Sequence, residues 1–237
     1  MKLEHSPFDS ENYGLRIGQL RAEPGDSERE LDEAMQLAQD QCDVCFFRLD
    51  EREPLVRLLE RRGAAPVDRL VTSALGPGRL KSAIPTGIAI TCSDRLAGKD
   101  VERASALMVA AMNRSHLHAD PRLPAEATRR LFAAWTRNDV TGRARVSIVA
   151  REGAAFVGLI TILVRGERAI LDLVAVGDRV RGRGVGSAML ASAVAWIDER
   201  RLAATVGTQS DNPALRLYAR HGFEPHMTEV TFHLWSR

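Results

Sequence analysis

Cysteine is scarce in this chain, which has only Cys42, Cys45 and Cys92 among its 237 residues. An odd and sparse set does not build a disulfide framework, and it is typical of a reducing compartment. Cys42 and Cys45 have the spacing of half a zinc site, yet no second cysteine pair completes it. We therefore expect these two thiols to be small packing residues, and we expect no metal centre.

Long apolar runs and a large excess of charge are also missing. The longest apolar segments, such as 156–164, have the length of a strand and are too short to cross a bilayer. Residues 1–5 lead into polar residues rather than into the apolar stretch of a signal peptide. The 33 Lys and Arg nearly balance the 31 Asp and Glu. These absences predict a globular cytoplasmic protein that binds neither membranes nor nucleic acid.

The segment 171–190 is the most informative stretch that is present. Its apolar start predicts a buried strand, and Arg181-Gly182-Arg183-Gly184-Val185-Gly186 leads from the strand into a helix. A glycine-rich helix start leaves the first N–H groups unpaired at the positive end of the helix dipole, which favours phosphate oxygens. Ser187 replaces the third glycine of a dinucleotide fingerprint, and the Lys of a Walker loop is absent. The pattern therefore indicates another kind of phosphate site.

A second motif follows a predicted strand at 203–208. It reads Asn212-Pro213-Ala214-Leu215-Arg216-Leu217-Tyr218 and is closed by Gly222. Asp211 or Asn212 can cap this helix, Pro213 suits its first turn, and the glycine suits its C-terminal stop. The spacing predicts a short helix that carries a tyrosine.

The two motifs together resemble the GCN5-related N-acetyltransferases (GNAT), over about residues 86–237. The resemblance implies an α/β fold with a mixed sheet, acetyl-CoA as co-substrate, and no metal. It implies that the amides of Val174 and Val176 serve the acetyl and pantetheine oxygens. Tyr218 would protonate the leaving thiolate, and Asn212 would hold the coenzyme. The other expected coenzyme contacts are Ala175, Arg181, Gly182, Arg183, Gly184, Val185, Gly186 and Ser187.

The group that accepts the proton of the amine is left open. Asp172 is a candidate, because the family often places a carboxylate on this strand, and regular alternation puts it on the same face as Val174 and Val176. The alternative is that Asp172 only accepts a structural hydrogen bond and that a water chain acts as the base. His116 and His118 are further candidates, unless they lie in a solvated loop.

The loop 113–124 gives the clearest indication of the acceptor. It resembles the acceptor side of the dTDP-fucosamine acetyltransferases, which acetylate a nucleotide-linked 4-amino-4,6-dideoxy sugar. This implies Ser115, His116 and Asp120 as substrate contacts, although Ser115-His116-Leu117 departs from that family's serine-arginine-phenylalanine pattern. Another small-molecule or protein amine, or a non-catalytic module that binds acyl-CoA, remains an alternative. A homodimer is compatible with the sequence, which leaves the oligomeric state open.

An internal repeat indicates how the chain is organised. Residues 54–66 echo 213–225, with proline, arginine, leucine, arginine, glycine and proline in register. The first copy has Leu59 in place of Tyr218 and no glycine-rich loop. We therefore expect a truncated, inactive GNAT-like domain over 1–80 and the catalytic domain over 86–237, joined by a linker rich in glycine and proline. A chance match between two amphipathic helices is the alternative.

Hydrophobic periodicity places the remaining elements. It predicts helices at 27–39, 53–62, 98–112, 124–138 and 184–200, besides the Tyr218 helix. It predicts strands at 15–20, 44–48, 69–75, 88–91, 145–150, 155–164, 169–176, 203–208 and 228–235. Glu152-Gly153 and Gly166-Glu167 are the expected hairpin turns. The sum is a mixed sheet with helices on both faces.

Overall fold

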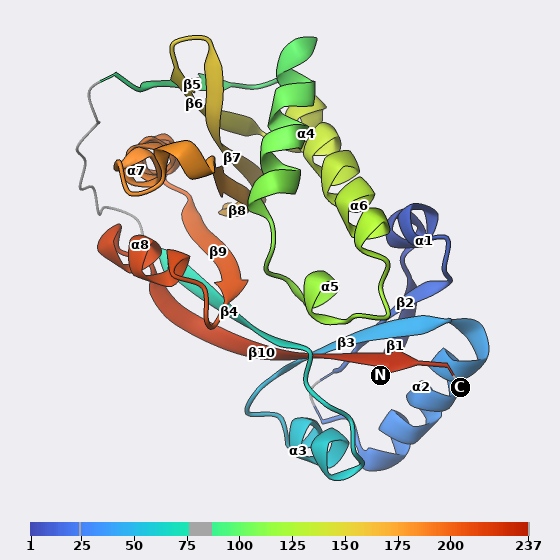
Figure 1. Cartoon of the computed structure of the whole chain (residues 1–237). Helices are drawn as coiled ribbons and strands as arrows, with labels where there is room; N and C mark the ends of the chain where they lie inside the picture. Colours follow the sequence, from blue (N-terminus) through green and yellow to red (C-terminus); the bar gives the residue numbers. More distant parts are fainter. Residues whose placement is uncertain (24, 76–86, 237) are drawn as a thin grey trace. The chain divides into compact units, whose positions relative to one another are not determined.

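The computed structural model describes residues 1–23, 25–75 and 87–236 (Figure 1). The chain forms two compact units, and neither is a continuous stretch. The first unit consists of Met1–Val71, Arg114–Leu131 and Met227–Arg237, and the second of Thr72–Asn113 and Phe132–His226. These two units differ from the predicted domains, which divide the chain once near residue 80. The division into an inactive and a catalytic domain stays a prediction. The expected linker falls, apart from Gly87, outside the described residues.

The first unit is built on four strands in the order β1-β2-β3-β10. β2 and β3 are parallel, and the outer pairs are antiparallel. α2 begins with a capping box, in which Ser27 and Glu30 satisfy each other's backbone N–H groups. The elements are β1 (Lys2–His5), α1 (Pro7–Tyr13), β2 (Ile17–Arg21), α2 (Glu28–Gln41), β3 (Val44–Asp50), α3 (Pro54–Arg61), the short α5 (His116–Ala119) and β10 (Glu224–Trp235), whose first three residues belong to the second unit.

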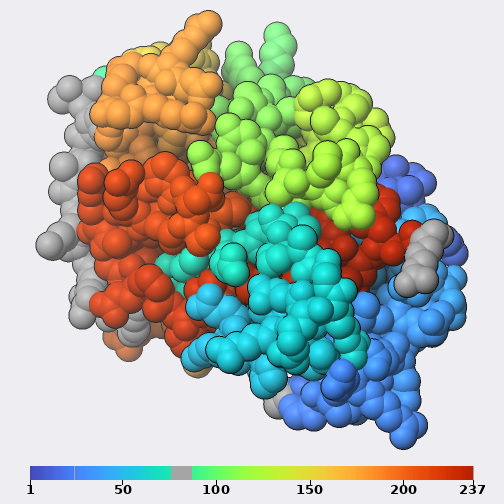
Figure 2. Space-filling view, turned by 60° about the horizontal axis from the view of Figure 1, so that its bottom comes forward, coloured from blue at the N-terminus to red at the C-terminus, as the bar shows by residue number. Residues whose placement is uncertain are grey.

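The core of the first unit lies between its strands and the pair α2 and α3. Leu31 and Leu59 from the two helices meet Phe47 and Phe232 from the strands, all of them buried. The blue α2 and the cyan α3 lie side by side at the surface in Figure 2, and Arg62 pairs there with Glu28 and Asp32. Apolar helix faces packed on a half-buried sheet therefore hold this unit together.

The second unit has strands in the order β9-β8-β7-β6-β5, with only β8 and β9 parallel among these neighbours. α7 covers one face of these strands and α4 the other (Figure 1). The elements are β5 (Ala89–Ser93), α4 (Lys99–Ala111), β6 (Val146–Glu152), β7 (Ala155–Arg165), β8 (Arg168–Val176), α7 (Val185–Asp198), β9 (Ala203–Gln209) and α8 (Ala214–Arg220). β4 (Asp68–Leu75) and α6 (Ala125–Asn138) have residues in both units, and η1 (Asp139–Arg143) and η2 (Asp178–Val180) are single turns.

Each face of this second sheet has its own buried core. The α7-side core joins Met189 and Leu190 of α7 to Ile148 and Ile160 of the sheet. The α4-side core joins Met108 of α4 to residues of the sheet's opposite face, including Val149, Leu159 and Leu173. Strand side chains alternate between the two faces of a sheet, so membership of one core shows whether a strand residue points toward α7 or toward α4.

The expected mixed sheet is confirmed, and each strand and helix expected from periodicity is present within a few residues at its ends. Each copy of the internal repeat is a helix followed by a strand, as expected: α3 with β4, and α8 with β10. Sequence reasoning missed β1 and α1, the short helix α5, and the π-helical turn η1. No helix in the described part of the chain has both the length and the apolar character needed to span a membrane.

Cys42 and Cys45 are buried and unpaired, as expected for packing residues, whereas Cys92 is exposed. Burial raises the pKa of Cys45 to about 12, so its thiol stays protonated and unreactive. Both sulfur atoms crowd Gly18 of β2, where an added Cβ would lie 2.6 Å from Cys42 Sγ and 3.3 Å from Cys45 Sγ. The strand therefore needs glycine at this position for space.

We predict that Gly18→Ala lowers the free energy of unfolding by roughly 1–3 kcal/mol, the range for overpacking a well-packed core. In a Cys42→Ala background the same change should cost clearly less, because the nearest colliding atom is gone and only the flexible end of Leu3, 2.9 Å from the added Cβ, still collides. Urea denaturation of the four proteins of this cycle measures both values. Equal penalties in the two backgrounds would show that the contact with Cys42 is not the cause.

Candidate functional site

β8 contains one residue more than its neighbour β7 along their shared ladder. Ile160 pairs with Val174, Thr161 with Leu173 and Ile162 with Leu171, which leaves Asp172 without a partner. This is a β-bulge, and it shifts the alternation of the strand by one residue. Leu171 belongs to the α7-side core, whereas Leu173 belongs to the α4-side core.

The bulge decides which amides of β8 point away from β7. The N–H of Gly177 bonds to Val157 O at 2.9 Å, and the N–H of Leu173 bonds to the Thr161 side chain. Alternation then directs the N–H groups of Val174 and Val176 to the opposite side, where β9 is the neighbour. The described pairing of β8 with β9 ends at Leu171 and Val206. We call 172–176 the open edge of β8, because its outward amides lie beyond that ladder.

Ala175 lies between these two valines but is not brought to the open edge. Its side chain is buried in the α4-side core, and it pairs with Leu159 of β7. Alternation directs its N–H to β7. Of the three residues expected on this strand, two therefore present amides to the open edge and one does not.

The glycine-rich segment after β8 forms the start of α7 as expected. Gly182 and Gly184 have φ angles of +77° and +80°, a left-handed conformation that glycine adopts without strain. No side chain caps the helix, and its first α-helical bond runs from Ala188 N to Gly184 O. The N–H groups of 185–187 are therefore left at the positive end of a 14-residue helix.

The polar side chains around this helix start already have partners. Arg183 pairs with Glu152 at 2.5 Å and Arg181 with Asp178 at 2.8 Å, both at exposed positions. Exposed ion pairs contribute at most about 1 kcal/mol, so either arginine can turn to an incoming anion. The hydroxyl of Ser187 lies 2.7 Å from His221 Nε2, at the end of α8. What Ser187 offers to a ligand at this helix start is then its backbone N–H.

α8 lies against the start of α7. A Cβ added to Gly186 would lie 3.2 Å from Leu217 of α8 and 3.4 Å from Val176 of β8. Asn212 Oδ1 accepts the N–H of Ala214 at 2.9 Å, so this asparagine caps the helix, as its sequence predicts. Tyr218 is 3% exposed and packs in the α7-side core, where burial raises the pKa of its phenol. The end of β8, the start of α7 and α8 thus meet at one glycine.

Asp172 does not share a face with Val174 and Val176, so the expected common face is wrong. Asp172 Oδ2 accepts hydrogen bonds from Trp135 Nε1 at 2.8 Å and from Arg143 Nη1 at 2.7 Å. Trp135 packs against the α4-side core, whereas the two valines pack against the α7-side core. The bulge is the physical reason, because it interrupts the alternation at Asp172 itself.

Arg143 also binds a second carboxylate, Asp139, which is fully buried. Burial raises the pKa of Asp139 to about 6, and the negative charge of Asp172 adds to the rise. A hydrogen bond from Thr161 and the positive charge of Arg143 oppose it. Sequence reasoning missed Asp139, Arg143 and Thr161. The spacing of four residues between Asp139 and Arg143 was the available signal, but it is equally common in exposed helical pairs.

The residues expected to bind the acceptor lie in the first unit. Asp120 is buried and accepts hydrogen bonds from Arg122, from His233 Nδ1 at 2.9 Å and from Trp235 Nε1 at 2.8 Å. Burial would raise the pKa of Asp120, but these donors lower it well below its usual range. Both carboxylate oxygens are occupied, so Asp120 acts here as an internal anchor. Its contact with a substrate stays a prediction.

His116 is linked to that anchor rather than exposed in a solvated loop. Its Nδ1 lies 2.8 Å from His233 Nε2, and both rings contact Phe46. Because Asp120 only accepts, His233 donates from Nδ1 and receives from His116, which leaves His116 Nε2 as a proton acceptor. Burial lowers the pKa of His116 well below its ordinary value, and the nearby charge of Arg48 adds to this. Ser115 Oγ lies 2.8 Å from His118 Nδ1.

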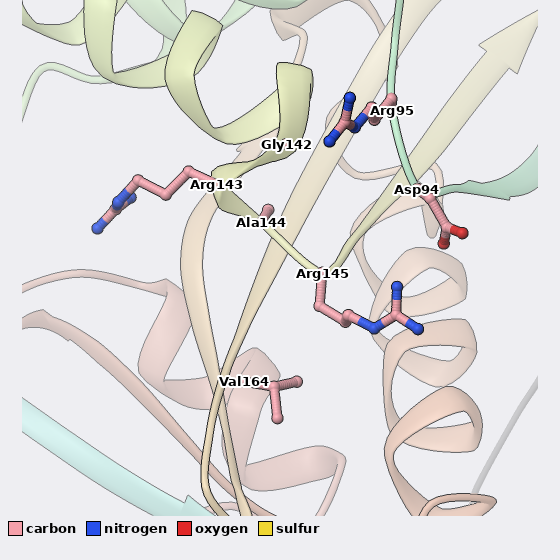
Figure 3. Close-up of a pocket in the computed structure, with 7 residues that line it drawn as sticks. All are labelled: Asp94, Arg95, Gly142, Arg143, Ala144, Arg145 and Val164. Atoms are coloured by element: carbon pink, nitrogen blue, oxygen red, sulfur yellow. The ribbon is translucent and has the colours of Figure 1, made fainter.

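An open pocket of about 240 Å³ lies at the end of η1 in the second unit. Figure 3 shows Arg143 leaving the turn on the opposite side from Asp94 and Arg145. Besides these three residues, its lining consists of Arg95, Gly142, Ala144 and Val164. None of the residues predicted to bind coenzyme or acceptor lines it. Among the described residues, no group of three or more His, Cys, Asp or Glu side chains is arranged to hold a metal ion.

The sequence pattern of the acetyltransferase (GNAT) family matches residues 109–223 of this chain. These residues include β8 with its open edge, the start of α7, and α8. This match covers just under half of the chain. Together with the fold, it supports an N-acetyltransferase of the GNAT type.

Individual proteins are similar to this chain in sequence or in fold. The spore coat polysaccharide biosynthesis protein SpsD of Bacillus subtilis is 33% identical over 138 residues, which are 57% of this chain and 48% of SpsD. The chain thus matches about half the length of that relative. A GCN5-related N-acetyltransferase from Sphaerobacter thermophilus has the same fold at 18% identity, with a TM-score of 0.65 over 98% of this chain and 75% of the other. A tandem GNAT protein from the clavulanic acid biosynthesis pathway is 15% identical, with a TM-score of 0.61 over 92% of this chain and 74% of the other.

We predict that Asp139 gives the stability of the protein a distinct pH dependence. With a pKa near 6 in the folded protein and an ordinary value of 3.8, Asp139 binds a proton more readily when folded. Its contribution is complete below about pH 4 and is lost as the pH rises through 6. Between pH 4 and 7 the unfolding free energy of wild type should therefore fall relative to Asp139→Asn, by on the order of 2 kcal/mol. Urea denaturation across this range tests it, and parallel curves would contradict it.

Proposed function

We propose that the chain is an acetyl-CoA-dependent N-acetyltransferase that acts on the amino group of a nucleotide-linked amino sugar. One observation carries the proposal: the open edge of β8 and the helix α8 both lie against the uncapped start of α7. Two strand amides beyond the described β8–β9 ladder and a helix N-terminus on adjoining elements suit a long ligand with carbonyl groups and a diphosphate. Acetyl-CoA is such a ligand.

The coenzyme would lie across three elements of the second unit. The diphosphate would bind the N–H groups of 185–187, with Arg181 and Arg183 released from their exposed ion pairs to add charge. The amides of Val174 and Val176 would donate to the pantetheine and acetyl oxygens. Asn212 uses Oδ1 to cap α8, which leaves its side-chain NH₂ to donate to the coenzyme.

Tyr218 would protonate the departing thiolate. Burial raises the pKa of its phenol, so the hydroxyl carries its proton at neutral pH and can donate it to sulfur as the C–S bond breaks. Its place on the helix capped by Asn212 supports this role. In such a reaction the amine attacks the thioester carbonyl, the C–S bond breaks, and the proton passes from phenol to sulfur.

The amine must first lose its own proton, and two groups remain candidates for accepting it. Asp172 lies in the same unit as the proposed coenzyme site, where it accepts hydrogen bonds from Arg143 and Trp135. His116 is neutral at physiological pH, and its Nε2 is the accepting end of the chain that runs from Asp120 through His233. His116 belongs to the first unit, so we propose Asp172 as the base and keep His116 as the alternative.

The acceptor class rests on two supports. The name of SpsD associates that relative with polysaccharide biosynthesis, and the loop 113–124 resembles the acceptor loop of the dTDP-fucosamine acetyltransferases. A nucleotide-linked amino sugar is the acceptor that satisfies both. A cytoplasmic location belongs to the same proposal, because all three cysteines are free thiols.

Release of the coenzyme thiol tests the proposal. Purified protein and acetyl-CoA are incubated with a dTDP-linked 4-amino-4,6-dideoxyhexose, with free amino sugars, with amino acids and with a lysine peptide, and acetylated product is identified by mass. Turnover with the sugar nucleotide is expected. Turnover with another amine alone would overturn the acceptor class, and binding of acetyl-CoA in calorimetry without any turnover would indicate a non-catalytic module.

Tyr218→Phe should lower kcat by about 100-fold, the typical contribution of a general acid, and leave the Kd for acetyl-CoA unchanged. The chain has two tyrosines, so Tyr13→Phe is the matched control. Tyr13 is also buried, and its hydroxyl bonds to Thr128 in the first unit. Steady-state kinetics and calorimetry on both variants make the comparison, and an equal loss of kcat in the two would argue against Tyr218 as the acid.

The pH dependence of the rate should distinguish the two candidate bases when each is replaced in turn. We expect Asp172→Asn to lower the rate about 100-fold at pH 7 and to recover part of it at pH 9, where more of the acceptor amine is already neutral. His116→Gln should change the rate much less. The pH–rate profiles of wild type and both variants decide the matter, and the reverse order of effects would assign the base to His116.

A further inference from the structure

The hydrogen bonds that hold the β8 bulge come from two buried side chains with no other assigned role. Thr161 Oγ1 accepts the N–H of Leu173 at 3.2 Å and donates its own proton to Asp139 Oδ2 at 2.6 Å. Thr161 and Asp139 are both fully buried. A hydroxyl that gives its proton to a carboxylate presents its lone pairs elsewhere, so Asp139 fixes the direction in which Thr161 accepts.

This contact matters because it selects the amides of the open edge. In the first half of β8 the pairing with β9 fixes the alternation as far as Leu171. If the strand alternated regularly through Asp172, the amides of Leu173 and Ala175 would face the β9 side, and those of Val174 and Val176 would face β7. The bulge reverses this order, and Leu173, the first residue after the bulge, is bonded to Thr161.

We infer that Thr161, oriented by Asp139, is a positioning residue for coenzyme binding: it holds β8 in the bulged register that turns the Val174 and Val176 amides to the open edge. The inference rests on the proposed function, since it assigns those amides to acetyl-CoA. Neither Thr161 nor Asp139 touches the coenzyme in this scheme. Each acts through the backbone of β8.

Two matched pairs of variants test the inference. Thr161→Val keeps the shape and removes the hydroxyl, whereas Thr161→Ser keeps the hydroxyl. Asp139→Ala removes the acceptor of that hydroxyl, whereas Asp139→Asn keeps an acceptor. Ser147→Ala is the control, because Ser147 pairs with Thr161 across β6 and β7, and its buried hydroxyl has no partner among the described residues.

Calorimetry with acetyl-CoA is the main readout. Thr161→Val and Asp139→Ala should weaken the affinity about tenfold, the equivalent of one well-placed hydrogen bond, while Thr161→Ser, Asp139→Asn and Ser147→Ala bind within about twofold of wild type. If Thr161 and Asp139 only stabilise the fold, Thr161→Val and Asp139→Ala should have lower melting temperatures. They should then bind acetyl-CoA as well as Thr161→Ser and Asp139→Asn do. Wild-type affinity in a folded Thr161→Val protein would overturn the inference. If that variant does not fold, the Asp139 pair decides in the same way.

Hydrogen exchange separates failure of the inference from failure of the proposed function. In coenzyme-free protein, the Leu173 amide should exchange at least tenfold faster in Thr161→Val than in Thr161→Ser, because its acceptor is lost. Equal exchange of the Leu173 amide in the two variants would overturn the inference, whether or not the protein binds acetyl-CoA. Absence of acetyl-CoA binding by wild type would instead refute the coenzyme site itself.

Discussion

A β-strand offers its amides alternately to its two neighbours, and a single extra residue at Asp172 changes which amides β8 offers in its second half. The open edge of the second unit follows from that shift. It brings Val174 and Val176 to the edge that β9 has left, and it moves Ala175 into the core. It also turns Asp172 toward Trp135 and Arg143. The chemistry of the sheet is thus set by a backbone irregularity rather than by an unusual side chain.

The sequence predicts regular elements well, because periodicity and turn residues are local properties. It gave the strand before the glycine-rich segment, the uncapped start of α7 and the Asn212 cap of α8, each of which depends on neighbours within a few residues. The bulge could not be predicted in this way. It depends on Thr161 and Asp139, which lie 11 or more positions before Asp172 in the chain and meet β8 only in the folded sheet.

The acceptor-side residues illustrate the same limit. The resemblance of the loop 113–124 to a known acceptor loop predicts Asp120 and His116 as substrate contacts. Nothing nearby in the sequence indicates His233 or Trp235, which lie more than 100 positions away. The folded protein joins them into one hydrogen-bonded chain. Two buried carboxylates consequently differ in character: donors lower the pKa of Asp120, whereas burial outweighs the donors at Asp139 and raises its pKa. Residue type and spacing cannot distinguish these cases.

The missing side chain of Gly186 has a mechanical consequence. With only hydrogen at this position, the first turn of α7 packs closely against Leu217, and an added methyl group would lie only 3.2 Å from that side chain. In the proposed complex, the distance between the amides of the helix start and the phenol of Tyr218 is then set by contact between packed elements, which are stiffer than loops. That distance would have to match the span from the diphosphate to the thioester of acetyl-CoA.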